Sequence, residues 1–344
     1  MNNLKKMKEI LNIKYPIITS YTQDANMLAI LSCYPTTEEW IFNNYVNLWG
    51  EEPTFKNGYT MLRFHSWEIK RACPYLEIKT YNKSFFSSDI VEFLISIIDS
   101  GKYIDTIYDQ FYVPCSERYM KTHFIHDMLI YGYDRERRIF YIGDFMEISK
   151  YTFNIVTFEC VESAIGNSLD STIFGCDVIE YKNTNYSFNT YFLCNSLNNL
   201  LFSKNVIADN ENVIMADVEI EQIKKGLYTF GIKNYSLLRQ TLLKIVNGTV
   251  EFSDVRPLHV ILDHKVMMCE RLKYLSKIGL ISDDDRIIEE YTNIKYICQT
   301  NRSLFIKYTI TRNNSLVERI INNLNLVEEI EIKTLTKLIK SLSD

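Results

Sequence analysis

The chain has 344 residues, of which 47% are hydrophobic and 24% charged, a composition typical of globular proteins rather than disordered or fibrous ones. Its 38 basic and 43 acidic side chains give a formal charge of -5, which argues against the basic surface that nucleic-acid binding requires. No secretory signal is visible and the most apolar stretch, 93–98, is much shorter than a membrane span, so we expect a soluble cytoplasmic protein without membrane contact.

The first 100 residues are predicted to be mainly helical, and residues 1–10 also have a helical pattern. Asp24 is a suitable N-cap for a short helix that Pro35 would end. A capping pattern at Ser88 or Asp89 and a stop at Gly101 bound another helix. The helices predicted in this part of the chain cover 25–31, 40–49 and 89–98.

After residue 100 the chain becomes rich in β-branched and aromatic residues, which favours strands. The fully charged stretch 134–138 is predicted to be a hairpin turn in water. The predicted strands are 103–113, 124–133, 139–145, 153–161, 177–181 and 213–220, and a helix is predicted over 190–201.

From about residue 232 apolar residues recur at three-and-four spacing, which predicts helices again. The acidic cluster 283–285 favours the positive end of one of them. The predicted helices are 235–245, 258–278, 286–308, 315–326 and 329–342. The fold class is therefore α+β, with an α+β domain over 1–230 and a mainly helical region over 231–344.

The segment from Thr122 to Phe145 contains the most informative candidate site. If 134–138 is a turn, His126 near the start of one strand lies beside Asp144 near the end of its partner. A carboxylate there would fix the imidazole tautomer and stabilise its charged form, as the third member of a nucleophile–base–orienter triad does. The alternative is a purely structural hydrogen bond, which is the commoner case for a single sequence.

This arrangement resembles papain-like cysteine enzymes, whose histidine and acidic or amide partner lie on neighbouring strands while the cysteine begins a helix. It is most similar to the butirosin-biosynthesis-type family, which uses a papain-like fold for acyl transfer. The resemblance rests on 21–31, on the hairpin from His126 to Asp144, and on 231–233. It implies an acyl or peptidyl carrier protein as partner, a small-molecule amine as acceptor, and a place in bacterial specialised-metabolite biosynthesis, such as that of nonribosomal peptides.

The chain departs from this family at the nucleophile. Where the cysteine would precede the apolar run 27–31, the sequence has no cysteine and reads Tyr-Thr-Gln-Asp-Ala-Asn over 21–26. Without a thiolate the usual thioester cannot form there. Three hypotheses remain: catalysis is lost and the fold serves binding, Thr22 or Asp24 supports an altered chemistry, or Cys33 or Cys115 reaches His126.

The eight cysteines are scattered without a CxxC pair, which predicts reduced thiols and no structural zinc. His123 and His126, three apart on a predicted strand, would point to opposite faces and would not bind one ion. His259 and His264 are interpreted as solvated or core histidines. We therefore predict no metal and no cofactor.

Two functions follow from these patterns. In the first, the protein is an enzyme of acyl or peptidyl transfer, with His126 as general base and Asp144 as orienter, and the base could activate the amine directly. In the second, it is a catalytically inactive papain-like scaffold that binds a carrier protein or a biosynthetic intermediate. A regulatory or self-resistance role is a third hypothesis, and self-association of the chain stays open.

Overall fold

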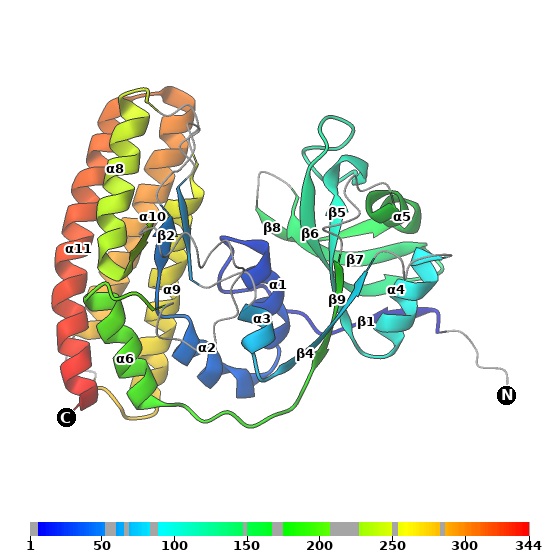
Figure 1. Ribbon diagram of the computed structural model, residues 1–344, viewed down its shortest axis with the longest axis horizontal. Coiled ribbons are helices and arrows are strands. Elements are labelled where there is room, and N and C mark those ends of the chain that lie inside the picture. The colour runs from blue at the N-terminus through cyan, green and yellow to red at the C-terminus, as the bar shows by residue number, and fades with distance from the viewer. Residues whose placement is uncertain are drawn as a thin grey trace. The chain divides into compact units, whose positions relative to one another are not determined.

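A computed structural model describes residues 6–51, 60–64, 69–82, 89–146, 150–166, 175–206, 227–249, 254–282 and 286–343 (Figure 1). The chain forms two compact units, each built from two stretches: Met1–Thr37 with Cys73–Asn185, and Glu38–Ala72 with Tyr186–Asp344. This division differs from the expected one after residue 230. The reason is long-range pairing, because strands near residues 50 and 62 join a sheet with the strand at 228–230.

The first unit contains an antiparallel seven-stranded sheet of order β4-β9-β5-β6-β7-β8, with β1 paired to β6. Its strands are β1 (Lys8–Ile10), β4 (Leu76–Asn82), β5 (Tyr103–Asp109), β6 (Ile125–Asp134), β7 (Ile139–Phe145), β8 (Tyr151–Thr157) and β9 (Gly175–Tyr181). Asp134 pairs with Ile139, which confirms the predicted charged turn between β6 and β7.

The helices of this unit are α1 (Thr22–Leu31), α4 (Ile90–Asp99) and α5 (Phe158–Gly166), with two short 3-10 helices, η1 (Pro35–Thr37) and η3 (Gln110–Tyr112). Helix α4 begins as predicted, since the Asp89 side chain accepts a hydrogen bond from the Glu92 backbone N–H at 3.0 Å. Helix α1 begins two residues before Asp24, with Tyr21 at its N-cap, so the prediction that Asp24 caps it is wrong.

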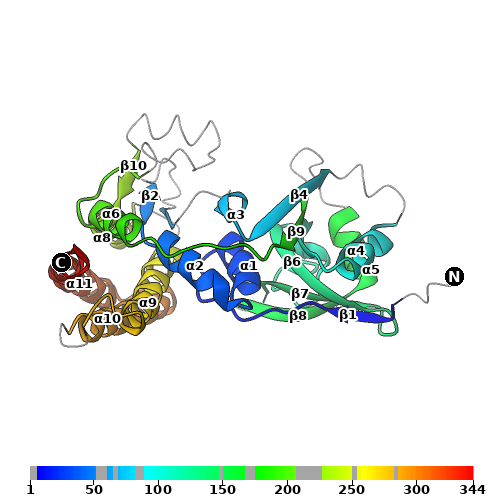
Figure 2. The ribbon, with the colours of Figure 1, turned by 90° about the horizontal axis from the view of Figure 1, so that it is seen from below.

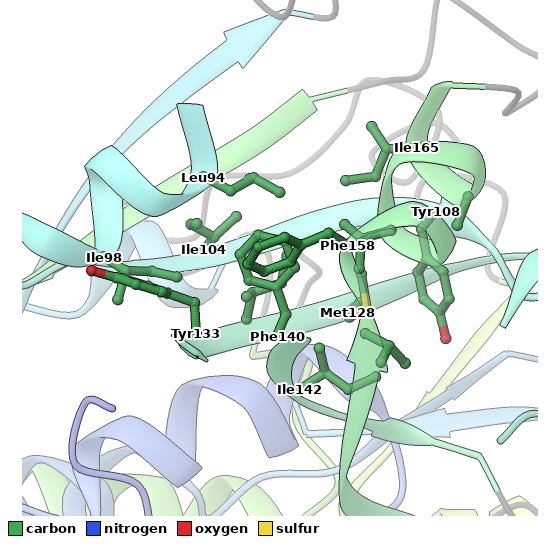
Figure 3. Close-up of a cluster of buried hydrophobic side chains, with 14 of the residues drawn as sticks. Leu94, Ile98, Ile104, Tyr108, Met128, Tyr133, Phe140, Ile142, Phe158 and Ile165 are labelled. Atoms are coloured by element: carbon green, nitrogen blue, oxygen red, sulfur yellow. The ribbon is translucent and has the colours of Figure 1, made fainter. Parts of the chain in front are cut away.

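Side chains of a strand alternate between the two faces of the sheet, and helices cover both faces here. One face carries the hydrophobic core that α4 and α5 cover, with Ile104, Tyr108, Met128, Phe140 and Ile142 contributed by β5, β6 and β7 (Figure 3). On the other face lies α1: the Asn26 side chain donates to Asp105 at 3.0 Å and accepts from the Tyr151 hydroxyl at 2.8 Å. The even-numbered residues of β5, of β7 and of β6 as far as Ile130 therefore belong to the face that α4 and α5 cover. A β-bulge between Ile130 and Gly132 inverts this pattern, so that Tyr133 belongs to the same face.

The second unit is mainly helical (Figure 2). It also contains a small antiparallel sheet of order β10-β2-β3. Its strands are β2 (Trp49–Glu51), β3 (Met61–Arg63) and β10 (Tyr228–Phe230). Its helices are α2 (Glu38–Asn44), α3 (Ile69–Ala72), α6 (Thr190–Leu201), α8 (Asn234–Val246), α9 (Arg256–Lys277), α10 (Ile287–Thr311) and α11 (Asn314–Ser343). The predicted α+β class with a mainly helical C-terminal part is confirmed. Within the described residues, no helix combines the length and the apolar character needed to cross a membrane.

Several predicted elements have different forms in the structure. Residues 8–10 form a strand rather than a helix, because they pair with β6. The predicted helix 40–49 ends at Asn44, and Trp49 opens β2. The predicted strand 153–161 is β8 followed by α5, and the last two predicted helices are one helix, α11. The predicted strand 213–220, Ser88 and the acidic cluster 283–285 lie outside the described residues.

Gly231, at the start of the 3-10 helix after β10, occupies a position that only glycine suits. Its φ is +53°, and a Cβ atom there would lie 2.1 Å from the backbone oxygen of Leu200. We expect Gly231→Ala to lower the free energy of unfolding by about 2 kcal/mol, measured by urea unfolding. Gly248 is the matched control, because its φ is +67° but nothing lies within 4 Å of an added Cβ. Equal losses in the two alanine variants would mean that the close approach at Gly231 has no effect.

Candidate functional site

His126 and Asp144 form a direct pair, as the sequence predicted. The imidazole Nδ1 of His126, on β6, lies 2.8 Å from Oδ1 and 3.0 Å from Oδ2 of Asp144, on β7. The Asp144 side chain is completely buried, whereas 22% of the His126 side chain is exposed. By strand alternation both residues belong to the face that α4 and α5 cover, since His126 is opposite Tyr108 in the register of β5 and β6.

The buried carboxylate of Asp144 accepts hydrogen bonds from the protein at both oxygens. The backbone N–H of Phe145 donates to Oδ1 at 2.6 Å. The Tyr108 hydroxyl donates to Oδ2, and the Gln110 amide donates to the same oxygen at 3.2 Å. Burial, with the Asp144 charge as a second cause, holds the pKa of Tyr108 well above its ordinary value, so the phenol stays a donor. These bonds offset the cost of burying the charge of Asp144.

The environment of His126 favours its protonated form. Burial of the ring opposes protonation, but the Asp144 carboxylate, with a contribution from Asp127, outweighs burial and raises the pKa of His126 above its ordinary value. When the ring is neutral, the carboxylate fixes the proton on Nδ1 and leaves the lone pair on Nε2. A hydrogen bond with the backbone of Asp127 also favours the protonated ring. The imidazole ring of His126 stacks on the Phe124 ring at a centroid distance of 5.4 Å. The guanidinium of Arg118 lies over the Phe124 ring, 4.0 Å from its centroid.

A second histidine–aspartate pair, which the sequence reasoning missed, lies just before β6. His123 Nδ1 is 2.6 Å from Oδ2 of Asp109, and Oδ1 of Asp109 accepts from the backbone N–H groups of Phe111 and Phe124, each at 3.0 Å. Burial favours the neutral form of Asp109, but the hydrogen bonds from His123 and from those two N–H groups together outweigh burial and lower the pKa of Asp109. Asp109 thus fastens both ends of the loop between β5 and β6, a role that only the strand register reveals.

The other candidates from the sequence are not brought to His126. Thr22 and Asp24 are buried in the first turn of α1, and α1 packs on the opposite face of the sheet from His126. The Cys33 thiol donates to the backbone oxygen of Ala29 at 3.5 Å, and burial raises its pKa. Cys115 packs against the core that contains Tyr108. None of these four is among the hydrogen-bond or ring partners of His126.

Neither a metal site nor a disulfide is found in the described parts of the chain. No group of three or more His, Cys, Asp or Glu residues there could hold a metal ion, and no two of the eight cysteines are bonded to each other. His264 is a core residue, with Nε2 donating to the Val46 oxygen at 2.8 Å. The Nε–H of Arg302 donates to Nδ1 of His259 at 2.7 Å, and burial lowers the pKa of His259 to about 4.

The second unit contains a buried charged network that is satisfied by protein groups. Lys265 Nζ lies 2.5 Å from Glu331 Oε1 and 2.9 Å from His264 Nδ1. The hydroxyl of Tyr235 donates to the other oxygen of Glu331 at 2.5 Å, and that of Tyr291 donates to Oε1 at 3.3 Å. Because each charge has a partner and all five side chains are buried, we interpret this network as structural.

The chain was compared with known protein families and with curated proteins. No family model matches it, and no curated protein is similar to it.

Proposed function

We propose that the protein transfers an acyl or peptidyl group from a thioester to an amine, with His126 as the general base and without an acyl-enzyme intermediate on a cysteine. The His126–Asp144 pair carries this proposal, because a buried carboxylate lies 2.8 Å from Nδ1 while 22% of the His126 side chain is exposed to an incoming substrate. The papain-like ancestry of the first unit, a carrier protein as acyl donor, and a role in specialised-metabolite biosynthesis belong to the same proposal, supported by the resemblance of the hairpin.

In the proposed step the amine nitrogen attacks the thioester carbonyl, and Nε2 of His126 takes the proton that this nitrogen must lose. The resulting imidazolium is stabilised by Asp144. The carbon–sulfur bond then breaks, the amide forms, and His126 returns its proton to the departing thiolate. His126 is thus returned to its neutral form at the end of each turnover, and no oxidant or second nucleophile is required.

This chemistry requires no residue of α1. The resemblance implies a nucleophile at the start of that helix, facing the histidine. Strand alternation instead assigns His126 to the face opposite α1, which argues against a direct role for Thr22 or Asp24. A histidine–aspartate pair without an adjacent thiol fits an acyl transfer in which the amine attacks the thioester directly.

The test is aminolysis of a simple thioester, the acetyl thioester of N-acetylcysteamine, by a panel of primary amines between pH 6 and 9. We expect the protein to accelerate thiol release and His126→Gln to lose this acceleration by a factor of about 10² or more. His123→Gln is the matched control, because it removes a nearby histidine that is also paired with an aspartate. No acceleration by the native protein at any pH, or full activity of His126→Gln, would contradict the proposal.

The alternative is a catalytically inactive scaffold that binds a carrier protein or a biosynthetic intermediate. The specific observation in its favour is that the interactions found for His126 among the described residues include neither Cys33 nor Cys115, the two thiols considered for the usual intermediate. Titration calorimetry with an acylated carrier protein separates the two functions. Binding without thiol release, equal in the native protein and in His126→Gln, would favour the scaffold.

A further inference from the structure

We propose that Tyr108 and Gln110 are positioning residues that fix the orientation of Asp144 and limit the basicity of His126, and that Gln110 links His126 to the loop between η3 and β6. The inference deepens the proposed function, since its catalytic meaning rests on His126 as the base. Its physical content, the coupling of these side chains to the protonation of His126, holds whether or not the protein turns over a substrate.

Tyr108 is the fixed donor of this arrangement. It is completely buried in β5, directly opposite His126 in the strand register, and its hydroxyl donates to Oδ2 of Asp144. Figure 3 shows its ring among the core side chains that α4 and α5 cover. Because the core packing holds the Tyr108 ring in place, its hydroxyl cannot follow the Asp144 carboxylate if the carboxylate rotates. The hydrogen bond therefore keeps Oδ2 of Asp144 in one position.

Gln110 is the second donor, and its own orientation is set by the loop. Its amide nitrogen lies 3.2 Å both from Oδ2 of Asp144 and from the backbone oxygen of Phe145. Its amide oxygen accepts from the Ser116 hydroxyl at 3.1 Å, and that hydroxyl accepts from the backbone N–H of Arg118 at 3.1 Å. The serine thus fixes which end of the amide faces Asp144. A displacement of the loop at Ser116 would break its hydrogen bond to the Gln110 amide and so weaken the hydrogen bond from Gln110 to the Asp144 carboxylate.

The direction of the effect follows from charge. Each hydrogen bond donated to a carboxylate stabilises its negative charge, and the charge then attracts a neighbouring proton less strongly. Tyr108 and Gln110 both donate to Oδ2, one of the two oxygens that His126 contacts. Loss of either donor should therefore raise the pKa of His126. A merely structural tyrosine would not have this effect, because its removal would leave the charge on Asp144 unchanged.

The test is an NMR titration of the imidazole signals in the intact protein, with the His126 signal identified by its loss in His126→Gln. We expect Tyr108→Phe to raise the pKa of His126 by about half a pH unit or more, and Ser116→Ala to raise it by less. The matched control is Tyr133→Phe. Tyr133 is also completely buried, and its hydroxyl also donates to an aspartate, Asp99, at 2.5 Å, but it lies at the other end of β6.

The outcomes are distinct. A rise in Tyr108→Phe and Ser116→Ala, absent in Tyr133→Phe, supports the proposal, even if no thioester aminolysis is detected and the proposed function fails. An unchanged pKa of His126 in both Tyr108→Phe and Ser116→Ala would overturn it. An equal rise in Tyr108→Phe and Tyr133→Phe would also overturn it, because the change would then reflect general loosening of the core.

Discussion

Replacement of Glu331 by leucine is expected to lower the free energy of unfolding by about 3–5 kcal/mol, because it leaves the Lys265 ammonium buried without a counter-charge. Both side chains are almost fully inaccessible, with 1% of the Lys265 side chain and none of the Glu331 side chain exposed. A lysine in this position must either stay charged in an apolar surrounding or lose its proton, and each alternative costs free energy that the folded state must supply.

His264 cannot take over the role of Glu331. Its Nε2 donates to the Val46 oxygen and its Nδ1 accepts from Lys265, so the ring is the neutral tautomer with both nitrogens in use. Burial, with the nearby Lys265 charge as a second cause, lowers the pKa of His264 well below its ordinary value. Glu331 is therefore the only charged hydrogen-bond partner found for Lys265 among the described residues.

The measurement is urea unfolding of the full chain, followed by far-ultraviolet circular dichroism. The double variant Lys265→Met/Glu331→Leu should recover most of the loss, because apolar side chains of similar size replace both charges. Glu329→Gln on the same helix is the control: its partner Lys333 and Glu329 itself are mainly exposed, so the midpoint should not change. A double variant as unstable as Glu331→Leu would show that packing and the lost hydrogen bonds from Tyr235 and Tyr291, not the unpaired charge, explain the loss.

The local part of the fold could be predicted from sequence. Strand 139–145 and helix 190–201 have the predicted bounds, because alternation and helical spacing are local signals that neighbouring residues complete. The contact of His126 with Asp144 was predicted from the charged turn, but it also depends on a β-bulge between Ile130 and Gly132, which no sequence pattern indicated. Without this one-residue shift in register the two side chains would lie on opposite faces of the sheet. Where an element depends on a distant partner, as 8–10 depends on β6, the local helical pattern was misleading.

The surroundings of the site could not be predicted in this way. Tyr108 is 36 residues from Asp144 in sequence, and only the pairing of β5 with β6 places its hydroxyl at the carboxylate. Similarly, Lys265 and Glu331 are 66 residues apart, on helices whose packing the apolar spacing does not specify. That His126 lies on the face opposite α1 could not be predicted either. A hairpin pattern indicates the partner of His126 but not which side of the sheet a helix covers.

Replacement of Asp144 by asparagine is expected to destabilise the protein in a pH-dependent manner. In the native protein the pKa of His126 is raised above 6.5, although burial opposes its protonation, because the Asp144 charge outweighs burial. Asparagine keeps the shape and can still accept from Tyr108, but it removes the charge, so the pKa of His126 should fall below its ordinary value. The stabilisation by Asp144 is thus fully present below pH 6.5 and is lost as the pH rises through the folded-state pKa.

We therefore expect Asp144→Asn to lower the free energy of unfolding by about 3 kcal/mol at pH 5.5 but by only about 1 kcal/mol at pH 9, where His126 is neutral in both proteins. Urea unfolding at four pH values between 5.5 and 9 measures this difference. The control is the same substitution in a His126→Gln background, where the cost should no longer depend on pH. A cost that stays constant with pH in the native background would mean that Asp144 acts through its hydrogen bonds to Tyr108 and Gln110 rather than through the charge on His126. That result would also remove the electrostatic basis for His126 as a catalytic base.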